Sequence, residues 1–228
     1  MARTNANSNI VLRGYLHDQF LCRSKYRVVL IYDKLDVMAN SSEKENKEQK
    51  KHHQDQNTVL TSIFIAFILI FCYVAAAVYF PFPKFRLPTL LNRVVFTLRW
   101  LMISLLAIFA GVMAVGCTRF FTAAINPLDP SGKKYTEQLG NYLQNTVEQF
   151  LLHSFSLLTL STYLSEEKMY WIPVMVVLFT IARAVFFVGY YIDPLKRGVG
   201  FAMTWFPNIA LSAYCLYCIC VYGVQSPA

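Results

Sequence analysis

Five long apolar stretches, separated by short polar connections, account for most of the chain after residue 58. They run at about 59–80, 100–118, 147–164, 170–192 and 199–224. Bilayer hydrocarbon is about 30 Å thick, so a helix needs about 20 predominantly apolar residues to cross it. The pattern predicts an all-α integral membrane protein with five transmembrane helices. The polar loop after the second stretch becomes helical in character from Tyr135, so the third helix is expected to extend beyond the bilayer.

A polar arm, residues 1–57, precedes the first stretch. Residues 28–32 form a short β-prone run that could order locally, whereas residues 40–57 are almost wholly polar. Such a polar segment cannot bury enough apolar surface to offset its ordering entropy, so it predicts a disordered linker. The expected organisation is this partly disordered arm, a first transmembrane helix at 58–81 that acts as an uncleaved signal anchor, and a four-helix membrane domain at 93–224.

Composition supports the membrane class and excludes others. Only 15% of the residues are charged, against about 25% in soluble domains. The net charge of +8 comes from basic residues that flank the apolar stretches and form no nucleic-acid-reading module, so no nucleic-acid partner is expected. Of six cysteines, all but Cys22 lie in or at the ends of the stretches, which favours packing roles, with palmitoylation or redox chemistry as alternatives. No metal site is expected.

Basic residues near the stretch ends favour a cytoplasmic N-terminus. Of the lysines and arginines near the ends of the stretches, nine then lie inside and five outside, the latter being Lys84, Arg86, Arg93, Arg99 and Lys168. The loop at 81–97 is nevertheless more basic than a lumenal loop should be. The sequon at Asn40 is then expected to stay unmodified, and a glycan on it would invert the topology.

Arg183 lies near the middle of the fourth stretch. A charge at the centre of a span costs about 2.5 to 3.5 kcal/mol on insertion scales, so it normally faces a polar interior with a partner. Asn145 and Glu148, three residues apart on one face of the third helix, are the predicted partners. Alternatively, Glu148 is a carboxylate at a helix start, wetted by head-group water.

Tyr190 and Arg197 follow Arg183 at intervals of seven residues, although Pro194 intervenes. Together with Arg183 they are predicted to line a cleft that opens to the cytoplasm, where guanidinium groups suit carboxylates and the phenol suits a thiolate. The alternative places Tyr190 in the interfacial aromatic belt and makes Arg197 a topology signal. In the second stretch, Ala107 and Gly111 are four residues apart, a spacing that allows close helix packing within one chain or between copies.

The Asn-x-x-Glu pair followed by Arg, Tyr and Arg at intervals of seven is similar to the MAPEG superfamily, the membrane-associated proteins of eicosanoid and glutathione metabolism. The resemblance covers about residues 93–223. It implies a four-helix bundle assembled as a trimer, with glutathione as a possible ligand of Asn145, Glu148, Arg183, Tyr190 and Arg197. Enzymes of the superfamily usually have an arginine where this chain has Asn141, which argues against turnover.

Segments 93–99, 160–164, 197–201 and 204–207 look like those of the mattrin-type, five-span branch of the superfamily. That resemblance implies a membrane protein of the endoplasmic reticulum, trans-Golgi network or lysosome, non-catalytic or weakly catalytic. Its expected roles are membrane trafficking, secretion, epithelial barrier formation and control of Wnt receptors, with membrane proteins as possible partners. The alternative is a glutathione-dependent transferase or peroxidase. A channel or transporter is disfavoured because no repeat of broken helices is present.

Overall fold

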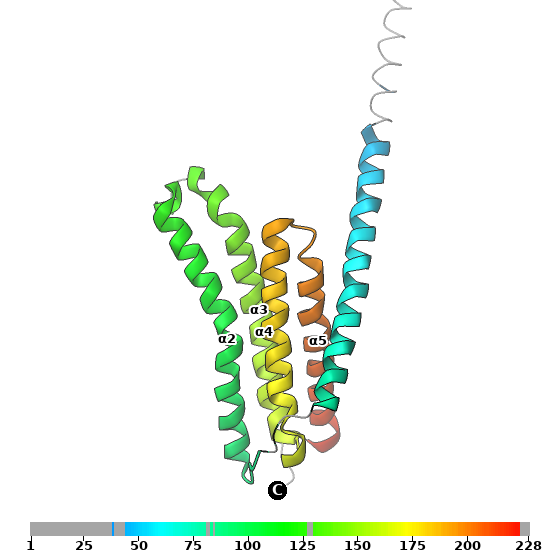
Figure 1. The fold of residues 1–228 in the computed structure, drawn as a ribbon, viewed down its shortest axis with the longest axis vertical. Helices are drawn as coiled ribbons and strands as arrows, with labels where there is room; N and C mark the ends of the chain where they lie inside the picture. Colours follow the sequence, from blue (N-terminus) through cyan, green and yellow to red (C-terminus); the bar gives the residue numbers. More distant parts are fainter. Residues whose placement is uncertain (1–37, 39–43, 81–82, 84, 127–129, 224–228) are drawn as a thin grey trace, which may run out of the picture. The chain divides into compact units, whose positions relative to one another are not determined.

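A computed structural model describes residues 38, 44–80, 83, 85–126 and 130–223. Every regular element in these ranges is helical, which confirms the all-α prediction. A first helix, Lys44–Tyr79, is followed by α2, α3, α4 and α5 (Figure 1). Their bounds are Leu90–Phe121, Lys133–Tyr163, Trp171–Ile192 and Gly198–Tyr222, and short 3-10 turns lie at Ala123–Ile125, Pro130–Gly132 and Glu166–Lys168.

Four helical segments are long and apolar enough to cross a membrane. They are Lys44–Tyr79, Leu90–Phe121, Glu166–Ile192 and Gly198–Tyr222. The helix that falls short is α3, whose apolar stretch at 147–164 was predicted as a span. It begins at Lys133, so its predicted extension beyond the apolar stretch is confirmed. Polar side chains along its inner face lower its hydropathy, because an inward-facing residue need not be apolar when another helix supplies a hydrogen-bond partner.

The first helix begins earlier than the sequence pattern suggested. Residues 44–57, expected to be part of a disordered linker, are helical and almost all exposed. Glu, Lys and Gln are good helix formers, and Lys44 and Lys51 each lie three or four residues from Glu48, a spacing at which opposite charges support a helix. Local helix propensity therefore overrides the absence of apolar surface. The β-prone run at 28–32 and the sequon at Asn40 lie outside the described residues.

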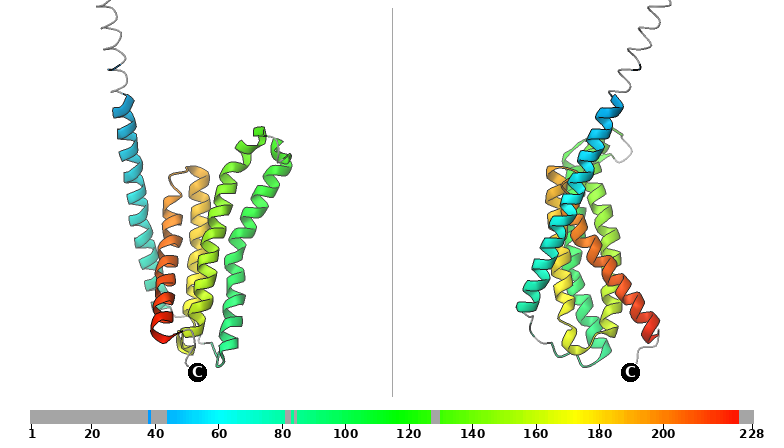
Figure 2. Two further views of the ribbon diagram at one scale, coloured as in Figure 1. Left: turned by 180° about the vertical axis from the view of Figure 1, so that it is seen from behind. Right: turned by 90° about the vertical axis from the view of Figure 1, so that its right-hand side faces the viewer.

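Residues 56–223 belong to one compact unit in which α2 to α5 form a four-helix bundle. Helix α2 packs on α3 and α4, and α5 packs on the same two helices (Figure 2). Ala107 and Gly111 of α2 are buried, and the Tyr142 ring of α3 lies close to Gly111 while its hydroxyl donates to the Ala107 carbonyl at 3.4 Å. This pair of small residues therefore serves packing within the chain.

The first helix packs against α4 and α5. Ala66 is fully buried in a cluster with Leu178 and Met203, and the Tyr73 hydroxyl donates to the Val174 carbonyl at 2.8 Å. Rings of Phe67 and Phe206 lie 4.7 Å apart. Both apolar and polar contacts thus join this helix to the bundle.

Helices α4 and α5 approach each other closely at Gly200. A Cβ atom there would lie 2.2 Å from the backbone nitrogen of Phe186 and 2.7 Å from the carbonyl oxygen of Ala182. No side chain fits at that separation, so glycine is required by the backbone contact. One helical turn further along α5, Thr204 is brought against α4 beside Arg183.

Candidate functional site

Arg183 lies on the inner face of α4 and is fully buried. Its Nη1 donates to Asn145 Oδ1 of α3 at 2.8 Å, and its Nη2 donates to Thr204 Oγ1 of α5. The guanidinium carbon lies 4.8 Å from the ring centroid of Phe186 and 5.8 Å from that of Phe179. The prediction that this charge faces the bundle interior is confirmed, and Asn145 is one of its partners.

The predicted ion pair between Arg183 and Glu148 is wrong. Glu148 is exposed, its Oε1 accepts a hydrogen bond from Gln144 Nε2 at 3.2 Å, and no described carboxylate lies within 4.0 Å of Arg183. Because residues four apart share a helix face more closely than residues three apart, Gln149, not Glu148, follows Asn145 into the interior. The Glu148 carboxylate therefore stays hydrated, and Arg183 donates to the neutral oxygen atoms of Asn145 and Thr204.

Neutral polar side chains continue the contact between α3 and α5 beyond Arg183. Together with Arg183, these side chains form what we call the polar seam: Asn145, Gln149, His153 and Ser156 of α3, Arg183 of α4, and Thr204, Asn208 and Ser212 of α5. Asn208 Nδ2 donates to Gln149 Oε1 at 3.1 Å, and Asn208 Oδ1 lies 3.2 Å from His153 Nδ1. The hydroxyls of Ser156 and Ser212 are 2.7 Å apart. Successive turns of the two helices are therefore joined by hydrogen bonds.

His153 lies near the middle of the polar seam and is 1% exposed. Since Asn208 Nδ2 donates to Gln149, its Oδ1 is left to accept, which assigns the proton of His153 to Nδ1. The imidazole stacks on the Phe179 ring at 4.4 Å, and its Nε2 has no hydrogen-bond partner among the described residues. The surrounding space is too tight for a water molecule. The residues that the structure describes hold no cluster of three metal-ligating side chains, so they give no support for a ligand role of this histidine.

Tyr190 and Arg197 lie together at the end of α4, whereas Arg183, predicted to line a cleft with them, lies on the other side of Phe186. The exposed Arg197 guanidinium lies 4.9 Å from the centroid of the buried Tyr190 ring. The Tyr190 hydroxyl accepts from Asn141 Nδ2 at 3.5 Å, and its carbonyl accepts from Gln138 Nε2. We call Tyr190 and Arg197 at this end of α4 the Tyr190 mouth. The ring of Phe186 separates it from Arg183, since this ring contacts both Arg183 and, at 5.8 Å, the Tyr190 ring. The five candidate residues therefore divide into three groups: Asn145 with Arg183 in the interior, Tyr190 with Arg197 at the mouth, and Glu148 by itself.

Six members of the polar seam escaped the sequence analysis. They are neutral, and attention to charge passed over them: Gln149, His153, Ser156, Thr204, Asn208 and Ser212. A signal was present in their spacing. Polar residues recur every four positions on α3 at 145, 149 and 153, and on α5 at 204, 208 and 212, within otherwise apolar segments.

Comparison with known proteins identifies the family to which this four-helix bundle belongs. The model of the MAPEG family matches residues 94–217, more than half of the chain. The chain belongs to the MAPEG family. The match covers most of α2 and α5 and all of α3 and α4, including the whole polar seam, and leaves the first helix outside. The resemblance to this family is thus confirmed, and the protein is a multi-pass membrane protein of it.

Two relatives share the name Transmembrane protein 79, the protein also called mattrin. The mouse protein is 30% identical over 159 residues, and the bovine protein is 29% identical over the same length. Each alignment covers 69% of this chain and 40% of the relative, so the chain spans about two fifths of the relatives it matches. No solved structure matches the chain.

Proposed function

We propose that this MAPEG-family protein is non-catalytic or weakly catalytic and acts through its bundle as a membrane scaffold. The observation that carries the proposal is the state of Arg183. Its guanidinium is fully buried and donates to Asn145 and Thr204 of its own chain. In a ligand site, polar groups converge on an open cleft. A substrate carboxylate could reach this arginine only if the side chains packed around it, among them Phe179 and Phe186, moved aside, because the guanidinium is fully buried.

The proposed topology has five spans with the N-terminus in the cytoplasm. Packing supports a crossing by α3, because it runs back alongside α2 and connects to α4 at the far end. From Gln149 onward, its polar side chains are buried or half-buried in the bundle. The proposed parts are the arm at 1–57, the signal-anchor span at 58–81 and the four-helix domain at 93–224, assembled as a homo-oligomer, by family resemblance a trimer. Detection of an endoglycosidase-sensitive glycan on Asn40 in cells would refute the cytoplasmic placement.

The proposed cellular role is in the secretory and lysosomal pathway, in trafficking, secretion and epithelial barrier formation, with possible control of Wnt receptors. The similarity to Transmembrane protein 79 over 69% of the chain supports it. Tagged protein should co-fractionate with trans-Golgi or lysosomal membranes, and its depletion should slow delivery of a secreted reporter. A plasma-membrane or mitochondrial location, with secretion unchanged, would contradict this role.

The test of catalysis uses the purified full chain in detergent. Turnover of glutathione with an electrophile and with a lipid hydroperoxide should be absent or weak. Arg183→Ala is a poor probe because it would disturb the fold, whereas Tyr190→Phe and Arg197→Gln alter only the mouth. Arg99→Gln, on the exposed surface of α2, is the matched control. Robust turnover that is abolished by Tyr190→Phe and kept by Arg99→Gln would overturn the non-catalytic proposal.

A glutathione-dependent transferase or peroxidase is the second candidate. The mouth favours it, because an exposed guanidinium, a phenol and the Asn141 amide lie together there. A cation and a phenol suit a carboxylate and a thiolate, respectively. If glutathione binds, Arg197→Gln should weaken its affinity. An unchanged affinity in both Arg197→Gln and Glu148→Gln would show that the ligand lies elsewhere.

A further inference from the structure

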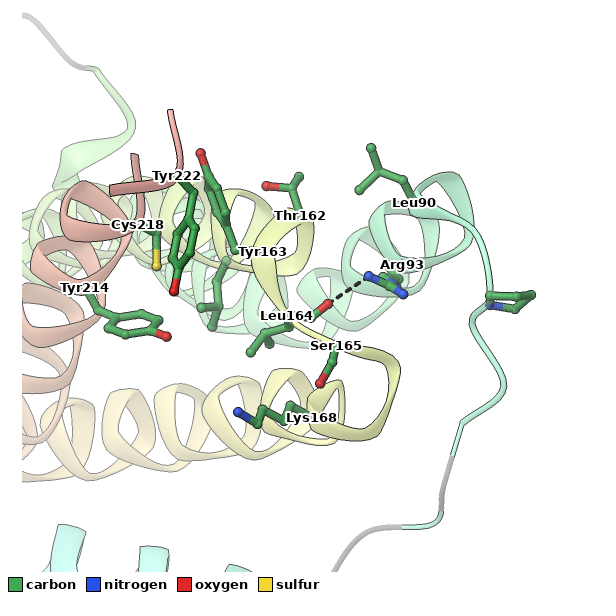
Figure 3. Close-up of a pocket in the computed structure, with 12 residues that line it drawn as sticks. Leu90, Arg93, Thr162, Tyr163, Leu164, Ser165, Lys168, Tyr214, Cys218 and Tyr222 are labelled. Atoms are coloured by element: carbon green, nitrogen blue, oxygen red, sulfur yellow. Dashed lines mark hydrogen bonds between the residues drawn. The ribbon is translucent and has the colours of Figure 1, made fainter. Parts of the chain in front are cut away.

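A pocket of about 680 Å³ opens at the end of the bundle opposite to the Tyr190 mouth. It is bounded by the start of α2, the end of α3, the connection to α4, and the end of α5 (Figure 3). Its volume lies in the range of small-molecule sites, about 300 to 1,000 Å³. None of the five candidate residues from the sequence analysis contributes to it.

Two cations line the pocket, Arg93 of α2 and Lys168 of the turn before α4. Arg93 is half-buried and donates from Nε to the Leu87 carbonyl at 3.2 Å and from Nη1 to the Leu164 carbonyl at 2.8 Å. These bonds fix the guanidinium plane and leave Nη2 without a partner among the described residues. Lys168 is exposed and has no ion pair in the same part of the chain. The nearby Glu166 carboxylate accepts from the Leu87 backbone N–H at 2.7 Å and is not within 4.0 Å of either cation.

Hydroxyl groups and apolar side chains complete the lining. Tyr214 and Tyr222 of α5 face the end of α3, where Ser165 and Thr162 lie, while Leu90 stands on the side of α2 (Figure 3). Tyrosine places a polar tip on an apolar body, the arrangement typical of membrane interfaces. Leu90 and Tyr222 are 48% and 56% exposed, so the apolar walls continue onto the outer surface of α2 and α5. The pocket therefore joins a cationic, hydroxyl-rich interior to surfaces that face lipid.

Electrostatics select the sign of the occupant. Arg93 and Lys168, which have no ion pair among the described residues, line the pocket, whereas the neighbouring Glu166 and Glu167 do not. These two cations and the start of α2, the positive end of a helix dipole, outweigh the end of α3, whose Leu164 carbonyl is already engaged by Arg93. We propose that this pocket binds the anionic head group of an amphiphile, a phosphate or carboxylate carried on an apolar tail. Arg93 Nη2 and Lys168 Nζ contact the anion, the hydroxyls supply further hydrogen bonds, and the tail lies along Leu90 and the apolar surface of α2 or α5. This site is independent of the proposed scaffold function.

The proposal also accounts for the basic character of the end of the molecule that the topology assigns to the outside. Arg93 and Lys168 are two of the five cations that oppose the positive-inside pattern. A cation that binds an anion has a role there, so its position need not follow the positive-inside pattern. Arg99, a third member of the group, is exposed and does not line the pocket.

The test uses the purified full chain in neutral maltoside micelles, titrated with dodecyl phosphate at low mole fraction, with binding followed by native mass spectrometry. Lys168→Gln and Arg93→Gln should each weaken binding by about tenfold or more, because each removes a charge-assisted contact. The Lys168 side chain is exposed and makes no hydrogen bond or ion pair within the described part of the chain, so its variant separates binding from stability. Arg99→Gln, the same residue type on the same helix, should leave the affinity within about twofold, since it lies outside the pocket.

Three outcomes would overturn the proposal. Equal binding by all three variants and the parent chain would show partition into the micelle alone. Inorganic phosphate that binds as tightly as dodecyl phosphate would show a site for a soluble anion and not an amphiphile. A diazirine placed beside the head group should crosslink to the segments around 160–168 or 214–222. Crosslinks confined to the Tyr190 and Arg197 end would place the ligand elsewhere.

Discussion

Arg183 and Arg93 show two uses of the same side chain in one bundle. Arg183 is fully buried, and its Nη1 and Nη2 donate to side chains of two neighbouring helices, whereas Arg93 is half-buried and donates to backbone carbonyls at a helix end. The first holds helices together in a region closed to water. The second is fixed by its backbone contacts and lines an open pocket. The contacts that the guanidinium N–H groups already make thus decide whether an arginine near a membrane span has a structural or a ligand-binding role.

The comparison would be broken most directly at Arg183. Arg183→Ala leaves a large cavity and removes the partner of Asn145 and Thr204 in a dry interior, so we expect a loss of about 3 kcal/mol or more in the free energy of unfolding. Reversible unfolding of the purified protein in mixed micelles, followed by circular dichroism, measures it. A loss below about 1 kcal/mol would show that the guanidinium contacts contribute little.

Gly200→Ala tests the close contact that brings Thr204 to Arg183. Its Cβ would meet the Phe186 backbone at 2.2 Å, so α4 and α5 must separate, and overpacking of this kind costs about 1 to 3 kcal/mol. Gly116→Ala on α2 is the matched control, because nothing lies within 4 Å of its added Cβ. That control should be neutral or up to about 1 kcal/mol stabilising, since alanine is the better helix former. Equal melting temperatures for the two variants would contradict the tight crossing.

Arg93→Ala tests the half-buried arginine of this comparison. The carbonyls of Leu87 and Leu164 that it releases lie near the surface, where water can replace the lost donors, so we expect a loss of only about 1 kcal/mol. The same micelle unfolding experiment reports it. A loss as large as that of Arg183→Ala would make Arg93 a structural anchor and remove the contrast between the two arginines.

The smallest effect is expected at Glu148. Because this side chain is exposed and bonded only to Gln144, Glu148→Gln should change stability by less than about 0.5 kcal/mol. Substitution of the buried neighbour, Gln149→Ala, should cost more, since it removes the side-chain acceptor of Asn208 Nδ2. A ranking of the two variants in the reverse order would place the interior face of α3 one residue away from that described.

The sequence was sufficient to predict the bounds of the apolar helices. It was insufficient to predict which polar side chains meet in the interior. Runs such as 170–192 and 199–224 are predominantly apolar, and α4 and α5 begin and end within two residues of them. The choice between the adjacent Glu148 and Gln149 depends on the rotation of α3 about its axis, which packing against α5 sets. Charge pointed to Arg183 correctly, but its partners are neutral residues that no charge pattern reveals.

The open pocket could not be predicted because no single segment encodes it. Its lining comes from the ends of three helices and the connection to a fourth, with Arg93 and Tyr222 separated by more than half of the chain. Only the unexpectedly basic outer loop hinted at it. Such sites depend on where helices end relative to one another, and helix ends are less well specified than helix interiors.

The first helix also restricts what the bundle can touch. Its contacts from Ser62 through Tyr73 occupy surface on α4 and α5, near Gly198 at one end and Val174 at the other. A second copy, or any other membrane protein, cannot use that occupied strip without displacing the helix. Sideways association in the bilayer is therefore directed to the remaining perimeter, where α2 shows Met102, Leu106 and Phe109 to lipid.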